Sequence, residues 1–393
     1  MGCIAYDGRF SDPRTAELLH LLRVVSTVVA LLFIFLLGIK GLGDGFKLLG
    51  KDVLESFFRA TGNPLTGLAV GILATTLVQS SSVTTSMIVA LVASPANPLP
   101  IANAIPMVMG ANIGTTVTNT LVSLAHMGRR DEFQRAFGVA TCHDFFNYLA
   151  VLVFLPLEMT TGFLQRLSAV LVDHLGTVSG TTYHSPLKGL LKAIMHPVES
   201  GLAHLIPGRQ WQGVVLAVLS AGVIFVALFL LVRVMKGAMQ TRVEVYINRF
   251  LDRSGVLAIL VGIVVTVMVQ SSSITTALLV PLAGAGLLTT RQAFPITVGA
   301  NIGTTVTALL ASLGVAGPHA AAGLQIALVH LSFNVGATLL IFPVPAIRSL
   351  PVRAAEGLAR VASRSRAWAI VYVAGLFYGI PALLAYVEHL QRR

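Results

Sequence analysis

The chain has 393 residues, of which 55% are hydrophobic and only 11% are charged. A typical soluble domain has about a quarter of its residues charged, so this composition excludes an ordinary soluble domain and predicts a polytopic membrane protein. The net charge is +11, but the basic residues fall in short segments between apolar runs. This distribution favours a role in membrane topology and argues against a nucleic-acid partner.

Several apolar windows reach the length of about 20 residues that a helix needs to cross a bilayer. Among them are Val24 to Ile39, Gln212 to Val232 and Ala367 to Val387. The first window has a long apolar core and no cleavage site close behind it, so it predicts a retained helix and not a signal peptide. The two cysteines, Cys3 and Cys142, form no CxxC pair and predict neither a disulfide nor a zinc site.

Three motifs occur twice in the chain and in the same order. GANIGTTVT stands at 110–118 and again at 299–307, and Gln-Ser-Ser-Ser stands at 79–82 and again at 270–273. The third pair is His143-x-x-Phe146-Asn147 and His330-x-x-Phe333-Asn334. The copies are separated by 191 residues for the serine motif, 189 for GANIGTTVT and 187 for the histidine motif. Because the order is kept and the spacing nearly constant, the chain is predicted to consist of two homologous halves.

Each half is predicted to contain a lead-in helix, an apolar hairpin with a polar centre, a helix broken at GANIGTT, and a helix with the His and Asn. The first half spans 1–158, with these elements at 24–46, 64–94, 101–125 and 136–158. An external loop is predicted at 159–210. The second repeat spans 211–345, with the elements at 211–235, 255–289, 293–315 and 320–345. A basic cytoplasmic loop at 346–366 then leads into 367–393, which holds a last transmembrane helix at 367–387 and a tail.

The number of crossings predicts the relative orientation of the halves. If each hairpin enters and leaves on one side, each half crosses the membrane an odd number of times, so the second half is inverted. The predicted fold class is an all-α polytopic membrane protein with two inverted-topology repeats, each with a re-entrant helical hairpin and a broken transmembrane helix. The positive-inside rule places three basic clusters in the cytoplasm and 159–210 and the C-terminus outside. The clusters are Arg129, Arg130 and Arg135; Arg233, Lys236, Arg242, Arg249 and Arg253; and Arg348, Arg353, Arg360, Arg364 and Arg366.

The repeated polar motifs predict a central binding site. Non-helical backbone at membrane depth is tolerated only where protein or a water-filled cavity surrounds it, and breaks at matching places in two inverted halves typically mark a transporter's site. We expect breaks at Gly110 to Gly114 and at Gly299 to Gly303. Half-helix N-termini and hydroxyl groups suit an anion, whereas carbonyl, hydroxyl and amide oxygens suit a hard cation such as sodium.

The absence of charged side chains from the predicted site predicts that the anion is transported together with cations. No Asp, Glu, Lys or Arg occurs between Thr61 and His126, and only Arg291 occurs between Gly255 and Val315. An anion there must be neutralised by cations that bind with it. Moving two negative charges inward against about 100 mV costs roughly 4.6 kcal/mol, at about 2.3 kcal/mol per charge, and two sodium ions cancel this cost.

The paired QSSS hairpins, GANIGTTVTNTLVS and the run RDEFQRAFGVATCHDFFNYLAVLVFLPLE resemble the type II sodium-dependent phosphate cotransporters. The resemblance covers roughly 62–158 and 253–366, and FNVGATLLIFPVPAIRSLPVR at 333–353 belongs to it. It implies a sodium-coupled phosphate symporter, without an enzymatic activity or a resident cofactor, whose two QSSS regions form the phosphate and sodium sites. The implied site residues are Gln79, Ser80, Ser81, Ser82, Thr84, Thr85, Asn112, Thr115, Gln270, Ser271, Ser272, Ser273, Thr275, Thr276, Asn301 and Thr304.

Two departures from the animal members of that family bear on origin and topology. The segment 159–210 has no cysteine and no Asn-x-Ser/Thr sequon, which resembles a smaller bacterial member in the plasma (inner) membrane. Animal members also continue with one more span after the last helix, which leaves the side of the C-terminus open. Electrogenic animal members have an acidic residue in the sodium-binding region of the first repeat, whereas none lies between Gln79 and Gly110 here. The sodium stoichiometry therefore stays open. The oligomeric state also stays open, with a homodimer as one alternative.

Other interpretations remain for the same residues. Serine and threonine in membrane helices often bond to their own helix, and the GANIGTT glycines can serve close helix packing. His143 and His330 fit a structural role, and Asp144, whose counterpart is Leu331, lies either at depth or at a helix end. The alternative functions are transport of another oxyanion, such as sulfate or a phosphonate, and a passive channel. An enzyme is disfavoured because no base or metal-ligand group adjoins the serine clusters.

Overall fold

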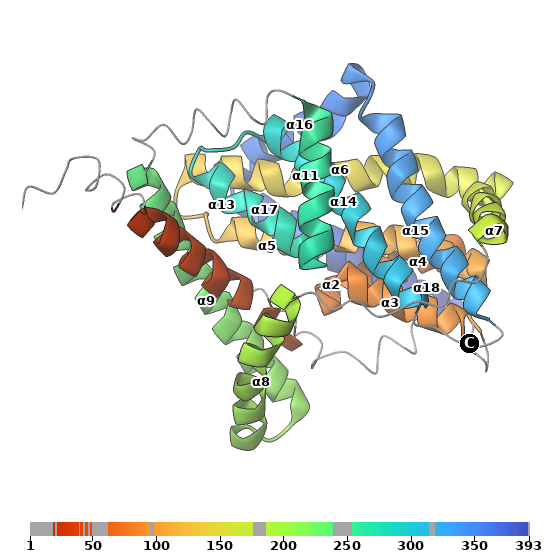
Figure 1. Ribbon diagram of the computed structural model, residues 1–393, viewed down its shortest axis with the longest axis horizontal. Coiled ribbons are helices and arrows are strands. Elements are labelled where there is room, and N and C mark those ends of the chain that lie inside the picture. The colour runs from red at the N-terminus through yellow and green to blue at the C-terminus, as the bar shows by residue number, and fades with distance from the viewer. Residues whose placement is uncertain are drawn as a thin grey trace, which may run out of the picture.

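The computed structural model describes residues 19, 22–38, 40–41, 44–45, 48, 62–94, 98–175, 186–238, 254–313 and 319–391. Over these ranges the regular secondary structure is helical, with no strand (Figure 1). Ten of the helices are apolar over most of their length, and five of these are long enough to cross a membrane. The five are Arg130–Thr161, Arg209–Ala227, Thr290–Ser312, Ala320–Ile341 and Ala367–Glu388. The chain is therefore an all-α, multi-pass membrane protein.

The first serine motif forms the tip of a helical hairpin. Helix α2 (Pro64–Val78) begins behind Asn63, whose side chain accepts a hydrogen bond from the Thr66 amide, and α3 (Ser81–Val92) runs back from the turn. Gln79 ends α2 with φ of 56°, in the left-handed region, where a side chain costs about 1–2 kcal/mol. Local strain of this kind is retained where the surrounding structure requires the turn.

The second serine motif forms a matching turn. Helix α11 (Gly255–Val269) ends at Gln270 with φ of 55°, and α12 (Ser272–Ala277) and α13 (Leu279–Gly284) follow. Among the described residues other than glycine, only the two glutamines have positive φ. The backbone therefore takes the same rare conformation at equivalent positions of the two sequence copies.

Close packing through glycine holds each hairpin against its own half. Helix α4 (Ile101–Gly114) crosses α2 so closely that a Cβ at Gly71 would overlap the carbonyl of Met107, and a Cβ at Gly110 would overlap the carbonyl of Leu68. Contact between helix backbones at this distance excludes every residue except glycine.

The same pair of contacts recurs in the second half. A Cβ at Gly262 of α11 would overlap the carbonyl of Ile296, and a Cβ at Gly299 would overlap the carbonyl of Ile259. Both Ile296 and Gly299 lie on α14 (Thr290–Leu313). The glycines of the repeated motif thus serve close helix packing, which the sequence left as an alternative interpretation.

The first copy of GANIGTT is interrupted later than predicted. Gly110 to Gly114 is helical, and the interruption lies at Thr115 and Thr116, between α4 and α5 (Val117–Leu124). The Asn147 side chain donates to the Asn112 carbonyl at 2.7 Å. The Thr116 amide, which would bond this carbonyl in a regular α-helix, donates to Ile113 at 3.2 Å instead.

The second copy is not broken, and the prediction of a break at Gly299 to Gly303 is wrong. Helix α14 continues through the motif from Thr290 to Leu313. Here Asn334, the counterpart of Asn147, donates to the carbonyl of His330 in its own helix at 3.0 Å. Among the described residues, no side chain donates a hydrogen bond to the Asn301 carbonyl, so this part of the helix stays regular.

The remaining helices pack beside the two hairpins and beside α4 and α14 (Figure 1). They are α6 (Arg130–Thr161), α7 (Phe163–Leu175), α8 (Pro186–Leu205), α9 (Arg209–Ala238), α15 (Ala320–Ile341), α16 (Pro345–Arg364), α17 (Ala367–Val373), the π-helix η1 (Ala374–Gly379) and α18 (Ile380–Gln391). Helices α7 and α8 lie within 159–210, which was predicted as a loop, and Figure 1 shows both at the margin of the molecule. The part of the lead-in segment that forms a continuous described helix is Leu22–Gly38.

Helix α15 connects the open ends of the two hairpins. Near its start, a Cβ at Gly323 would lie 3.3 Å from Ala93 at the end of the first hairpin. Just after its end, Phe342 lies against Gly255, where the second hairpin begins. Helix α15 has 22 residues and is therefore about 33 Å long. The two hairpins accordingly open near opposite ends of this helix.

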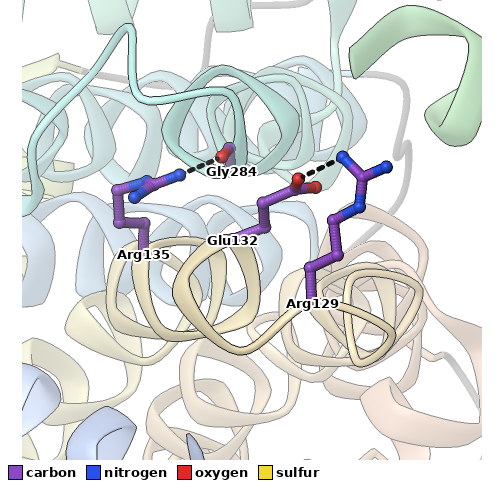
Figure 2. Close-up of polar contacts among 4 residues, drawn as sticks. All are labelled: Arg129, Glu132, Arg135 and Gly284. Atoms are coloured by element: carbon purple, nitrogen blue, oxygen red, sulfur yellow. Dashed lines mark hydrogen bonds and ion pairs between the residues drawn. The ribbon is translucent and has the colours of Figure 1, made fainter. Parts of the chain in front are cut away.

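Arg135 connects the first half to the second hairpin. Its guanidinium, on α6, donates to the carbonyls of Ala283 at 3.1 Å and Gly284 at 2.9 Å, where α13 ends. Figure 2 shows the bond to Gly284 beside the ion pair of Arg129 and Glu132, whose atoms are 2.9 Å apart. A cation at a helix C-terminus satisfies carbonyls that have no partner within the helix.

We expect Arg135→Ala to lower the free energy of unfolding by about 1.5–3 kcal/mol, because two carbonyls lose a charged donor. Arg129→Ala is the matched control, since the Arg129 side chain is 67% exposed and an ion pair with an exposed, solvated partner contributes from about 0 to 1 kcal/mol. Melting temperatures of the purified variants in one detergent measure the difference. Equal melting temperatures would show that Arg135 does not anchor the hairpin.

Candidate functional site

The first serine of each motif has a local structural role. The hydroxyl oxygens of Ser80 and Ser271 accept from the amides of Val83 at 3.4 Å and Ile274 at 3.3 Å, as helix N-caps do. Both serines are partly exposed. They shape the turns, and their backbone positions direct the next serines inward.

The next two serines of each motif are buried and keep their hydroxyl groups available. Their exposed fractions are 5% or less, and within the described ranges none of the four hydroxyls makes a hydrogen bond. They are Ser81, Ser82, Ser272 and Ser273. A hydroxyl group has one donor and two acceptor lone pairs, so these groups can bind either an anion or a cation.

The threonines that follow have their protons engaged. Thr84, Thr85, Thr275 and Thr276 donate to carbonyls one turn earlier, at 3.2, 2.8, 3.1 and 2.8 Å. The alternative interpretation of bonding to their own helix is therefore confirmed for these hydroxyls. Their oxygens still present lone pairs, which suit a sodium ion better than a phosphate oxygen.

The two hairpin tips converge on neighbouring residues of α5. Thr118 donates to the Oε1 of Gln79 at 2.7 Å. The single proton of the Thr276 hydroxyl is shared between the Ser272 carbonyl and the Oδ1 of Asn119, which lies 3.0 Å away. All four side chains are buried. The polar turns of the two halves therefore meet inside the helix bundle and are not separated at its periphery.

A second set of contacts crosses between the halves in a symmetric manner. His143 Nε2 lies 2.6 Å from Asn301 Oδ1, and His330 Nε2 lies 3.4 Å from Asn112 Oδ1. An amide oxygen only accepts, so the histidine nitrogen is the donor in each pair. Each histidine thus binds the GANIGTT asparagine of the other half, which is the structural role that the sequence favoured for both.

Asn147 joins the two GANIGTT segments. It donates to the Asn112 carbonyl and accepts from the Asn301 amide, both at 2.7 Å. The remaining predicted residues are also buried. Thr304 donates to the Ala300 carbonyl at 3.0 Å, Thr115 has a buried hydroxyl with no partner among the described residues, and Gln270 is 7% exposed.

We expect Asn147→Ala to cost about 1–3 kcal/mol of stability, because two buried groups lose their partner. Asn334→Ala is the matched control, since that amide donates only within its own helix among the described residues. Thermal unfolding in detergent measures both variants. A smaller effect of Asn147→Ala than of Asn334→Ala would contradict the bridging role.

Sequence symmetry alone did not identify Asn119, although Thr118 is the last residue of the repeated GANIGTTVT motif. Asn119 corresponds to Ala308 in the second half, so a search for repeated polar residues passes over it. The run Thr118, Asn119, Thr120 in an apolar segment was the available signal.

Asp144 lies at depth and not at a helix end. It is completely buried in the middle of α6, and Tyr372 of α17 donates to its Oδ2 at 2.6 Å. Its Oδ1 has no partner among the described residues. The alternative placement beside the arginine-rich loop is therefore wrong.

Comparison with known proteins agrees with the geometry. The Na+/Pi-cotransporter family model matches residues 34–173 and 223–381. Sodium-dependent phosphate transport protein 2B of Pongo abelii and that of Homo sapiens are each 34% identical over 445 aligned residues, which cover 90% of this chain and 64% of the relative. Sodium-dependent phosphate transport protein 2A of Ovis aries is 33% identical over 430 residues, covering 92% of this chain and 67% of the relative.

The chain thus spans 64% of the length of the 2B relatives. No solved structure matches it significantly. Since the family model matches well over half of the chain and the relatives exceed 30% identity over nine tenths of it, the chain belongs to the Na+/Pi-cotransporter family.

Proposed function

We propose that the protein imports inorganic phosphate together with sodium across the plasma (inner) membrane, by alternating access. The observation that carries this proposal is the convergence of both serine turns on Thr118 and Asn119. The relatives are named sodium-dependent phosphate transport proteins, which supports the same substrates here.

The proposed division of labour follows from the hydroxyl groups. The free hydroxyls of Ser81, Ser82, Ser272 and Ser273 donate to phosphate oxygens, helped by the amides that begin α3. The threonine oxygens and the amide oxygens of the site bind sodium. The proposed set is Gln79, Ser80, Ser81, Ser82, Thr84, Thr85, Asn112, Thr115, Gln270, Ser271, Ser272, Ser273, Thr275, Thr276, Asn301 and Thr304.

An inverted arrangement of the two halves is part of the proposal. Two observations support it: the hairpins open near opposite ends of α15, and equivalent glycines form equivalent helix contacts. With the basic clusters in the cytoplasm, the first hairpin opens outside and the second inside. Each hairpin then closes the common site from its own side, as alternating access requires.

Uptake of radiolabelled phosphate into proteoliposomes tests the proposal. We expect an inward sodium gradient to drive accumulation above the external concentration, and excess sulfate or phosphonate to compete weakly. Strong competition by sulfate would favour the other-oxyanion alternative. Flux that only equilibrates phosphate, with or without the gradient, would favour a channel and contradict the proposal.

A further inference from the structure

A cavity separate from the serine turns lies where three helices begin. Its volume is about 560 Å³. Helices α11, α14 and α16 start at this cavity, and the N-terminus of a helix carries partial positive charge. The lining side chains that matter here are Arg291, Phe294, Phe342, Arg348, Val352 and Arg353. Figure 1 shows α16 at the upper edge of the molecule, away from the C-terminal end.

The cavity is strongly cationic. Arg291, Arg348 and Arg353 line it, and no acidic residue does. Within the described part of the chain, none of the three arginines forms an ion pair. The Arg348 guanidinium lies 5.1 Å from the centroid of the Phe342 ring, a cation–π contact that orients it at the cavity. Three guanidinium groups without counter-ions attract a multiply charged anion, and guanidinium binds phosphate in bidentate fashion.

The cavity also has an apolar side. Phe294, Phe342 and Val352 line it and are buried, with exposed fractions of 2%, 9% and 5%. Apolar residues close in sequence to the lining residues Gly255 and Phe342 are exposed: Val256 and Leu260 on α11 at 61% and 50%, and Leu339 on α15 at 67%. In a membrane protein, such residues face lipid chains. The helices that border the basic cavity therefore also carry a lipid-facing surface.

This cavity is distinct from the serine site. Arg291 and Asn301 lie ten residues apart on α14, which corresponds to about 15 Å along the helix. None of the proposed substrate or sodium residues lines the cavity. The positive charge of this cavity is therefore not explained by the binding site proposed for the transported phosphate.

We propose that this cavity binds the phosphate headgroup of an anionic phospholipid from the cytoplasmic leaflet. The arginines contact the headgroup, and its acyl chains lie on the exposed side chains of α11 and α15. Basic recesses between transmembrane helices on the cytoplasmic side bind anionic headgroups in this way. The placement in the cytoplasmic leaflet rests on the proposed topology, whereas binding itself does not. Inorganic phosphate shares the headgroup's chemistry but would leave the exposed apolar side chains of α11 and α15 without a ligand.

Native mass spectrometry of the full-length protein in neutral detergent tests this, with phosphatidylglycerol and phosphatidylcholine as competing probes. We expect preferential retention of phosphatidylglycerol. Replacing Arg291, Arg348 and Arg353 together with glutamine should lower its apparent affinity on the order of 100-fold, at about fivefold for each arginine. The control exchanges Arg360 and Arg364 of α16 for glutamine, since neither lines the cavity. Size-exclusion chromatography verifies folding, and the single Arg348→Gln variant replaces the triple variant if that one aggregates.

A second arm separates the two sources of phosphate. Melting temperatures are compared with added phosphatidylglycerol and with added inorganic phosphate, for the wild type and the cavity variant. Lipid-specific stabilisation that only the cavity variant loses supports the proposal. Equal retention of both lipids, equal loss in the control, or cavity-dependent stabilisation by inorganic phosphate alone would overturn it. None of these outcomes depends on transport activity.

Discussion

Alanine at Ser81 or at Ser272 is expected to lower sodium-driven phosphate uptake about 10- to 100-fold. Each change removes a hydrogen bond to a charged group, which contributes about 1.5–3 kcal/mol in a buried site. The two serines occupy equivalent positions in the two hairpins, and both are at most 5% exposed. Because both turns are proposed to bind one phosphate ion, we expect losses of similar size. Initial rates over a range of phosphate and sodium concentrations measure them.

Ser86→Ala is the matched control for this experiment. Ser86 lies one turn further along α3, and its hydroxyl donates to the Ser82 carbonyl at 2.7 Å, within its own helix. We expect its uptake to stay within about twofold of the wild type, since such back-bonding contributes little. Normal uptake by the Ser81 and Ser272 variants, at normal expression, would contradict a shared serine site.

Alanine at Gly110 or at Gly299 is expected to destabilise the native helix bundle strongly. In each case the new methyl group would overlap a backbone carbonyl of the adjacent hairpin helix, from Leu68 or from Ile259. Overpacking of a side chain costs about 1–3 kcal/mol, and a rigid helix backbone relaxes less than a side chain does. We therefore expect a loss of about 3 kcal/mol or more, measured as melting temperature and yield of monodisperse protein.

Gly222→Ala controls for the intrinsic effect of the substitution. Gly222 lies on α9, and a Cβ there would meet no atom within 4 Å. Alanine favours a helix over glycine by about 1 kcal/mol in water, so this variant should be at least as stable as the wild type. If the Gly110 and Gly299 variants had the same melting temperature as the Gly222 variant, the helices would be able to move apart without a loss of stability, and this prediction would be wrong.

Much of the fold could be predicted because the apolar composition and the repeated motifs indicate it. The apolar content predicted an all-α membrane protein, which the structure confirms, and the motifs predicted a family that the comparisons confirm. The predicted hairpin ranges 64–94 and 255–289 also contain α2 with α3 and α11 with α13. Glycine and asparagine are the residues that commonly adopt the left-handed conformation. Gln79 and Gln270 are neither, so the local sequence did not predict their positive φ angles.

The conformation of GANIGTT could not be predicted from its own letters. The same nine residues are interrupted in one half and continuous in the other. The difference lies in a distant side chain: Asn147 takes the Asn112 carbonyl, whereas Asn334 bonds within its own helix. Tertiary contacts therefore decide where this motif bends, and a local pattern specifies only that it can.

The sequence predicted which residues belong to the candidate site but not the contacts that bring them together. The repeats indicated which serines and asparagines to pair, yet the contacts that bring the turns together involve Thr118 and Asn119. Asn119 has no polar equivalent in the second half, so symmetry gave no reason to select it. Contacts that break the symmetry of a sequence repeat can be identified only in the three-dimensional structure.

Equilibrium binding of radiolabelled phosphate to the purified protein, across a range of sodium concentrations, tests the central claim most directly. If two serine turns form one buried site for anion and cation together, phosphate affinity should rise steeply with sodium, and Ser81→Ala and Ser272→Ala should each weaken that dependence. Phosphate that binds equally well without sodium, and equally well to both variants, would contradict the account.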